Sequence, residues 1–315
     1  MDVIYSMVTL TLIFSTPIII TAIGGMFSER SGVVNIALEG IMMVGGFAAA
    51  TSLVFLEKSF SSAPWLALGV GIIAGALISL IHAYLSINLS SDQVISGTAI
   101  NLLAGGLTVY LSQIIFGQQR TQTFSTGFIK TTYDGLVDIP IIGRMFFENI
   151  YPTVYLALAL VVISWFVLYK LPFGLRLRAT GEHPHAVDSM GISVYKMRYI
   201  GVVLSGCFAG LGGAVMVLTF DTQYTIASIG GIGFIALAAL IFGKWKPFGL
   251  LGASLFFGFS QILSVYSTSY EWLAQFPQEF FKALPYVLTI VALVVFSDKS
   301  VGPKAAGEPY DKGSR

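Results

Sequence analysis

Long apolar runs, separated by short polar or glycine-rich segments, dominate the hydrophobic pattern of this chain. A helix that crosses a bilayer needs about 20 mostly apolar residues, because the hydrocarbon core is about 30 Å thick. The pattern predicts nine such helices, at residues 5–25, 32–56, 65–87, 94–116, 151–171, 199–220, 230–242, 248–266 and 283–296. The seventh is short and follows a glycine-rich turn at 230–233, so we expect a half-helix or a re-entrant element there.

Composition supports a membrane protein, since 55% of the 315 residues are hydrophobic and only 10% are charged. Soluble domains carry about 25% charged residues, and one water-soluble core of this size would not bury so much apolar surface. The formal net charge of +1 gives no sign of nucleic-acid binding. One cysteine, Cys207, allows no disulfide framework, and three histidines are too scattered to predict a metal site. The fold class is therefore an all-α, multi-pass membrane protein.

The distribution of lysine and arginine indicates how the chain is oriented. If the N-terminus lies outside, twelve of the seventeen basic residues fall on the inside and five on the outside. We therefore expect the N-terminus outside and the C-terminus inside. The first apolar run lacks a basic leader and a small-residue cleavage site, so we expect a spanning helix rather than a signal peptide.

One membrane domain, residues 1–297, precedes a polar tail, residues 298–315, which we expect to be cytoplasmic and disordered. Two loops of the domain are long. The outer loop, 117–150, is long enough to cap the outer face. The inner loop, 172–197, is the most charged stretch of the chain.

The inner loop contains signals for a short helix at about 185–190. Pro184 suits a first helical position, Glu182 lies near that start, and Gly191 lies where a C-terminal cap would fall. The loop is either an ordinary basic loop or a docking helix for a cytoplasmic partner, and the pattern alone leaves both open.

Polar residues inside the apolar runs are the other functional candidates. Asn35 and Glu39 are four residues apart and share a helical face. Ionisable groups within spans usually face the bundle interior or a cavity. Glu39 either lies on a translocation path, with Asn35, Asn101 and Gln261, or bonds another helix, through Asn101 or His82.

Glycines at 69, 71 and 75, and at 206 and 210, predict close helix packing. The sequence contains neither a phosphate-binding loop nor a metalloprotease or hydrolase motif. We therefore expect no catalytic centre and no bound cofactor in this chain, and we expect that it is not an enzyme.

Three segments carry a family resemblance: SERSGVVNIALEG from residue 28, GLRLRATGEHPHAVDSMGISVYKMRYIGVVLSGCFAGLGG from residue 174, and IFGKWKPFGLLGASLFFGF from residue 241. In this order they resemble the inner-membrane permeases of ABC importers, in the branch that includes ribose-type and branched-chain amino-acid permeases. The resemblance covers residues 18–297.

The resemblance implies a fold of the cobalamin-importer type (type II), with a discontinuous second helix near residues 28–35. It also implies a coupling helix that docks on a cytoplasmic ATPase, which would use ATP and magnesium. The residues that this assigns to coupling are Gly181, Glu182, His183, Pro184, His185, Ala186, Val187, Asp188 and Gly191.

The sequence of the first segment, with Glu29, Arg30 and Asn35, most resembles that of the nucleoside branch. The implied cargo is a nucleoside, such as the purine nucleoside guanosine; a simple sugar such as ribose is the alternative. The implied partners are a second, longer permease and an extracytoplasmic solute-binding lipoprotein, and the implied location is the cytoplasmic membrane of a bacterium. A secondary transporter and a non-transporting membrane subunit are rival classes. The first would prefer paired intramembrane acids, and the second would not explain a broken helix.

Overall fold

The computed structural model describes residues 2–60, 62–140, 142–267 and 302–313, with residues 283 and 287 singly. The regular secondary structure in these parts is helical, apart from one isolated β-bridge between Thr131 and Ile150. The elements, in order, are α1 (Asp2–Arg30), α2 (Leu38–Leu56), α3 (Ala63–Ala83), the π-helix η1 (Tyr84–Asn88), α4 (Gln93–Phe116), α5 (Ile142–Phe147), α6 (Pro152–Lys170), α7 (Pro172–Glu182), α8 (Pro184–Ser189), α9 (Val194–Phe220), the 3₁₀ turn η2 (Ile226–Ser228), α10 (Ile232–Phe242) and α11 (Pro247–Ser267).

Seven helices in the described part are long and apolar enough to cross a membrane. The seventh predicted run forms α10, which has 11 residues. At about 1.5 Å per residue it spans roughly half of the hydrocarbon core, so the half-helix expectation is confirmed. The ninth predicted run, 283–296, lies outside the described residues, and the count of nine is not confirmed.

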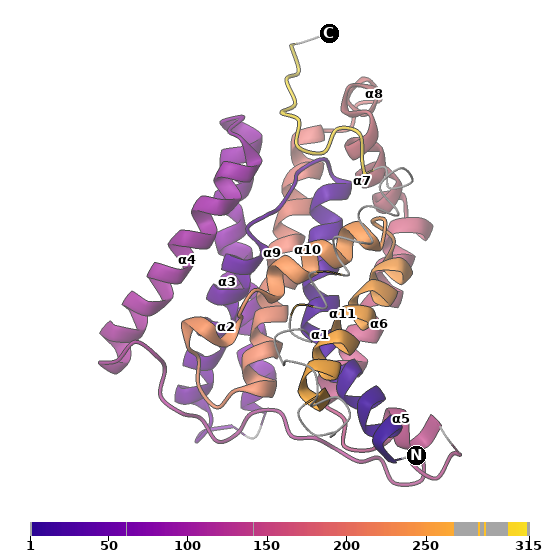
Figure 1. The fold of residues 1–315 in the computed structure, drawn as a ribbon. Helices are drawn as coiled ribbons and strands as arrows, with labels where there is room; N and C mark the ends of the chain where they lie inside the picture. Colours follow the sequence, from indigo (N-terminus) through magenta and orange to yellow (C-terminus); the bar gives the residue numbers. More distant parts are fainter. Residues whose placement is uncertain are drawn as a thin grey trace.

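Helix α9 is the centre of the bundle and packs against α1, α2 and α3 (Figure 1). Glycines bring it close to α3, because a Cβ on Gly75 would lie only 2.7 Å from the Cα of Gly210. Gly206 also contacts Gly75. The predicted small-residue packing is confirmed at these positions, whereas Gly69 faces open space.

Helix α4 leans away from the rest of the bundle (Figure 1). Its N-cap is Asp92, whose side chain accepts hydrogen bonds from the N–H groups of Val94 and Ile95, and its C-cap is Gly117, which has a φ of +69°. Only 22% of its apolar window is buried, the smallest share among the seven helices. Most of this helix is therefore open to lipid or to another protein.

The two long loops lie at opposite ends of the bundle. The outer loop packs on the ends of the helices, where the N–H of Phe128 donates to the carbonyl oxygen of Leu218. The inner loop contains two helices, α7 and α8, and the prediction of a single short helix there was incomplete. The N-terminus and the described end of the tail also lie at opposite ends (Figure 1), as the expected topology requires. Which end faces the cytoplasm stays a prediction.

Candidate functional site

A break in the helical chain lies between α1 and α2. Helix α1 ends at Arg30, Gly32 adopts a φ of +95°, and α2 begins at Leu38. The break expected near residues 28–35 is therefore present, but it separates two helices rather than interrupting one. Backbone groups that are buried away from water need internal hydrogen bonds. The Ser28 hydroxyl supplies one by donating to the carbonyl oxygen of Val33 at 2.7 Å.

Side chains near the α3–α4 connection bind the middle of the break. The carboxamide oxygen of Gln93 accepts from the N–H of Val34 at 2.7 Å. His82 Nε2 lies 2.9 Å from the carbonyl oxygen of Val34, and its Nδ1 lies 3.0 Å from the Ser96 hydroxyl. A carbonyl oxygen only accepts, so Nε2 carries a proton. Both polar groups of Val34 are thus satisfied without water.

Two asparagines bind the rest of the break. Asn35 is fully buried and donates to the Ser205 hydroxyl on α9 at 2.8 Å. Asn101, on α4, donates to the carbonyl oxygen of Ile36 at 3.0 Å and accepts from the N–H of Gly40 at 2.8 Å. These bonds join the break to the central helix on one side and to the leaning helix on the other.

Glu39 caps the half-helix α10. Its two carboxylate oxygens accept from the N–H groups of Gly231 at 2.8 Å and Gly233 at 2.7 Å. Free N–H groups and the helix dipole make a helix N-terminus favourable for a carboxylate. The interhelical role weighed for Glu39 is thus present, but the expected partners, Asn101 and His82, were wrong.

The opposite end of α10 is also tied to α1. The Trp245 indole N–H donates to Glu29, and Arg30 donates to the Trp245 carbonyl oxygen through Nε at 3.1 Å and Nη2 at 3.0 Å. Side chains that flank the break therefore hold the half-helix at both ends. These hydrogen bonds connect both ends of α10 to the residues around the break.

Three of the four candidate path residues meet at this break. Asn35 and Glu39 are buried, and Asn101 is half-buried beside them. Gln261 lies on α11, which packs mainly on α1 and α10, and it is not brought to the group. In this conformation the three residues bind backbone or a buried hydroxyl. Their place on a translocation path stays a prediction.

The short helix predicted in the inner loop is present as α8, and its docking role stays a prediction. Pro184 occupies the first turn, as expected. After the helix, Gly191 has a φ of +76°, its N–H donates to the carbonyl oxygen of Asp188, and the next N–H, of Ile192, donates to that of Val187. This bond pair is a Schellman cap. The cap residues that the sequence indicated are therefore confirmed.

Two of the residues assigned to coupling belong to the preceding helix. Gly181 and Glu182 end α7, and Glu182 lies 4.0 Å from Arg30 at the end of α1. A Cβ on Gly181 would lie 2.5 Å from the carbonyl oxygen of Arg30, so this contact needs glycine. The end of α7 and the break are thus in direct contact.

Comparison with known proteins decides the family. Residues 7–293 match the model described as a branched-chain amino acid transport system permease component. The chain belongs to this family of permeases. The permease is therefore a multi-pass transport component of the cell membrane, and the family resemblance of its motifs is confirmed.

Individual relatives of the permease are similar over nearly its whole length. It is 51% identical to the guanosine ABC transporter permease protein NupQ of Bacillus subtilis (strain 168), over 97% of this chain and 96% of that one. It is 42% identical to the nucleoside ABC transporter permease protein NupC of Lactococcus lactis subsp. cremoris (strain MG1363), over 96% and 95%. A second B. subtilis guanosine permease protein, NupP, is 28% identical over 77% of this chain and 69% of that one.

The expectation of a disordered tail is wrong for residues 302–313, which we call the C-terminal strap. The N–H of Ala305 donates to the carbonyl oxygen of Gly181 at 2.9 Å. Arg198 Nη1 donates to the carbonyl oxygen of Glu308 at 2.9 Å, and Tyr310 is 5% exposed. Polar composition suggested disorder, but the strap is held by main-chain bonds, which composition does not reveal.

Sequence reasoning missed Arg198, Trp245 and Tyr310 as parts of this region. Trp245 and Tyr310 are aromatic residues in polar segments, and this pattern could have indicated that their side chains are buried. The sequence gave no such indication for Arg198, because the positive charge on the inner side of the membrane already accounted for the basic stretch that contains it. The described residues contain no group of three or more histidine, cysteine, aspartate or glutamate side chains that could bind a metal ion.

Proposed function

We propose that this permease is the membrane subunit of an ABC importer that carries nucleosides, in particular purine nucleosides such as guanosine. The identity of 51% with a guanosine permease across 97% of the chain carries the proposal. A second nucleoside permease, at 42% identity, supports the same cargo class.

In this proposal a separate cytoplasmic ATPase supplies the energy and binds the ATP and magnesium. The sequence has no phosphate-binding loop, and its inner loops are too short to contain an ATPase domain. Helix α8 and its Schellman cap are the docking element. The end of the bundle that holds α8 is then cytoplasmic, and the N-terminus and the outer loop face outward, where a solute-binding lipoprotein delivers the nucleoside.

The second permease of the importer packs against α4 in this proposal. The exposed face of α4 includes the polar or small residues Thr98, Gly106 and Gln113. Polar groups within a span usually face protein rather than lipid, and small residues allow close approach. Two B. subtilis proteins named as guanosine permeases match this chain, which supports a heterodimer with a longer sister.

Transport follows from rocking of the two permeases around a path between them, in an arrangement of the cobalamin-importer type. Arg30 contacts Glu182 at the end of α7 and also binds Trp245, beyond α10. A displacement of α8 by the ATPase would thereby reach the break and the half-helix.

Uptake of radiolabelled guanosine by cells that lack this permease, with and without the restored gene, tests the proposal. We expect uptake to require the permease and cellular ATP, to survive a protonophore when ATP is maintained, and to be competed by unlabelled purine nucleosides. Competition by ribose but not by guanosine would overturn the nucleoside assignment. Uptake that survives ATP depletion but not the protonophore would overturn the ABC mechanism.

A further inference from the structure

The C-terminal strap lies where the break meets the end of α7. The N–H of Gly307 donates to the carbonyl oxygen of Gly32 in the break at 3.3 Å. The N–H of Ala305 donates to the carbonyl oxygen of Gly181, near the end of α7, at 2.9 Å. Two main-chain bonds therefore tie two separate elements to the same short segment.

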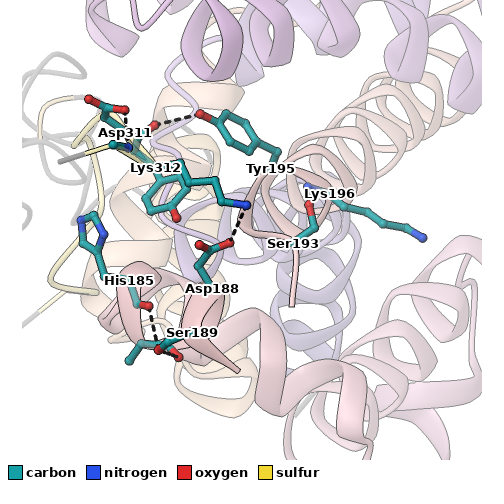
Figure 2. A network of polar contacts seen from close by, with 11 residues as sticks. His185, Asp188, Ser189, Ser193, Tyr195, Lys196, Asp311 and Lys312 are labelled. Carbon is teal, nitrogen blue, oxygen red and sulfur yellow. Dashed lines mark hydrogen bonds and ion pairs between the residues drawn. The ribbon is translucent and has the colours of Figure 1, made fainter. Parts of the chain in front are cut away.

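The far end of the strap is attached to α8 and to the start of α9. Between ring centroids, Tyr310 lies 5.1 Å from His185 of α8 and 5.6 Å from Tyr195 of α9. Figure 2 shows the polar contacts beside these rings. Lys312 reaches Asp188 at 3.7 Å, and the Tyr195 hydroxyl donates to the carbonyl oxygen of Tyr310 at 3.4 Å. The strap thus joins the break, α7, α8 and α9.

Arg198, near the start of α9, contacts the strap and is 1% exposed. Its Nη1 donates to the carbonyl oxygen of Glu308 at 2.9 Å, and its guanidinium lies 6.0 Å from the centroid of the Tyr310 ring. Its other two nitrogens, Nε and Nη2, have no hydrogen-bond partner among the described residues. Burial of a charged group with unpaired donors costs free energy, and this cost opposes the gain from burying Tyr310. The position of the strap therefore depends on two opposing contributions.

A cavity of ≈ 650 Å³ lies between the strap and the corner where α7 meets α8. Its lining includes Arg198, Glu182 and His183 on one side and Lys304 and Pro309 of the strap on the other. A segment packed along its whole length would lose many contacts on moving, whereas a segment beside a cavity loses fewer. The strap therefore rests on separate points of contact, and the cavity has room for water around Arg198 once the strap moves.

We propose that the strap is an intramolecular latch, which is seated on the break in this conformation and leaves it during each transport cycle. The seated strap restrains the break and the end of α7, because a change in the relative positions of the four elements that it joins breaks strap contacts. The cost of burying Arg198 keeps the seated state from being too stable to open. This inference rests on the proposed function for an ATP-driven cycle, but not on the identity of the cargo.

A reversible cross-link between the strap and the break tests the latch. In a Cys207→Ser background, Val34→Cys places a thiol in the break and Ala306→Cys places one on the strap. The pair is suitable because a Cβ on Gly307, next to Ala306, would lie 3.7 Å from Val34 Cγ2. A bifunctional thiol reagent that a reductant can cleave is applied to the complete permease complex, with its ATPase, in nanodiscs.

We expect joining to lower ATP hydrolysis by the complex about tenfold and cleavage to restore it, because the joined strap cannot leave the break. Ala306→Cys alone, treated in the same way, should stay within about twofold of the untreated protein. Failure of the thiols to join without ATP, or full hydrolysis after joining, would overturn the latch. Guanosine uptake is measured in parallel. Hydrolysis without uptake in the unjoined complex would overturn only the cargo assignment, and no hydrolysis before joining would overturn the ABC mechanism and the latch with it.

Loosening the strap should have the opposite effect. Tyr310→Ala removes the ring contacts with α8 and α9, so we expect ATP hydrolysis in the absence of cargo to rise about threefold as the released state becomes more populated. Tyr310→Phe keeps the ring contacts, and Lys304→Gln changes an exposed strap residue; both should hydrolyse ATP at the unchanged rate. An equal or lower rate for Tyr310→Ala, in a complex that retains its ATPase on purification, would overturn the restraining role. The cross-link decides the question where Tyr310→Ala does not assemble.

Discussion

Replacement of Glu39 tests how the half-helix α10 is held. Both carboxylate oxygens bind main-chain N–H groups, of Gly231 and Gly233, and the side chain is 4% exposed. Glu39→Ala leaves two buried donors without an acceptor. A hydrogen bond to a charged group contributes about 1.5–3 kcal/mol, so we expect a loss of about 4 kcal/mol in the free energy of unfolding.

Glu39→Gln separates the two interpretations of this residue. Its amide oxygen preserves one bond, while its NH₂ group faces the second N–H, so we expect a loss of about 2 kcal/mol. Chemical unfolding of the purified permease in detergent measures both variants, beside guanosine uptake. Asp134→Ala, at an exposed acid of the outer loop, serves as the control and should change stability by less than about 0.5 kcal/mol.

The order of stability among wild type, Glu39→Gln and Glu39→Ala distinguishes a capping role from a place on the translocation path. If Glu39 caps α10, stability falls from wild type through Gln to Ala, and uptake falls with it. Equal stability of all three proteins would refute the capping argument. Full stability of Glu39→Gln with impaired uptake would instead favour a place on the translocation path.

Three further predictions concern packing, coupling and pH. We expect Gly75→Ala to cost about 2 kcal/mol, because its methyl would meet the backbone of α9, whereas Gly69→Ala, with open space around it, should be neutral or slightly stabilising; chemical unfolding compares them. Gly191→Trp forces a bulky side chain into a φ of +76° and should lower uptake per ATP hydrolysed without preventing membrane insertion; an unchanged ratio would refute its coupling role. The main-chain N–H of Ser125 holds the pKa of Glu57 below its ordinary value. The contribution of the Glu57 carboxylate to stability is therefore present at neutral pH and is lost as the pH falls through that lowered pKa. The stability difference between wild type and Glu57→Gln should shrink on acidification, and a constant difference would contradict this.

Much of the helical layout was predictable because lipid imposes a simple rule. A span needs a long apolar run, and these runs were visible in the sequence. The cap residues of α8 were also readable, since Pro184 and Gly191 act through their own backbone preferences. Local chemistry therefore predicted the bounds of α8 to within one residue at each end.

The partners of the polar residues were not predictable in the same way. Glu39 was expected to bond Asn101 or His82, but it caps a helix that begins nearly 200 residues later. The sequence marks a buried carboxylate as needing a partner, but many donors satisfy that need equally well. Only the packing of α10 against α2 selects among them.

The amino-acid sequence by itself determined that this protein belongs in a bilayer, where its long apolar helices lie along the chain, and that a short helix, α8, begins near Pro184 and ends before Gly191. These features depend on composition and local backbone preference. The tertiary structure alone decided that the break, the half-helix and the C-terminal strap form one connected region. That connection depends on main-chain hydrogen bonds between distant segments, such as Ala305 to Gly181 and Gly307 to Gly32, and every residue offers the same main-chain groups.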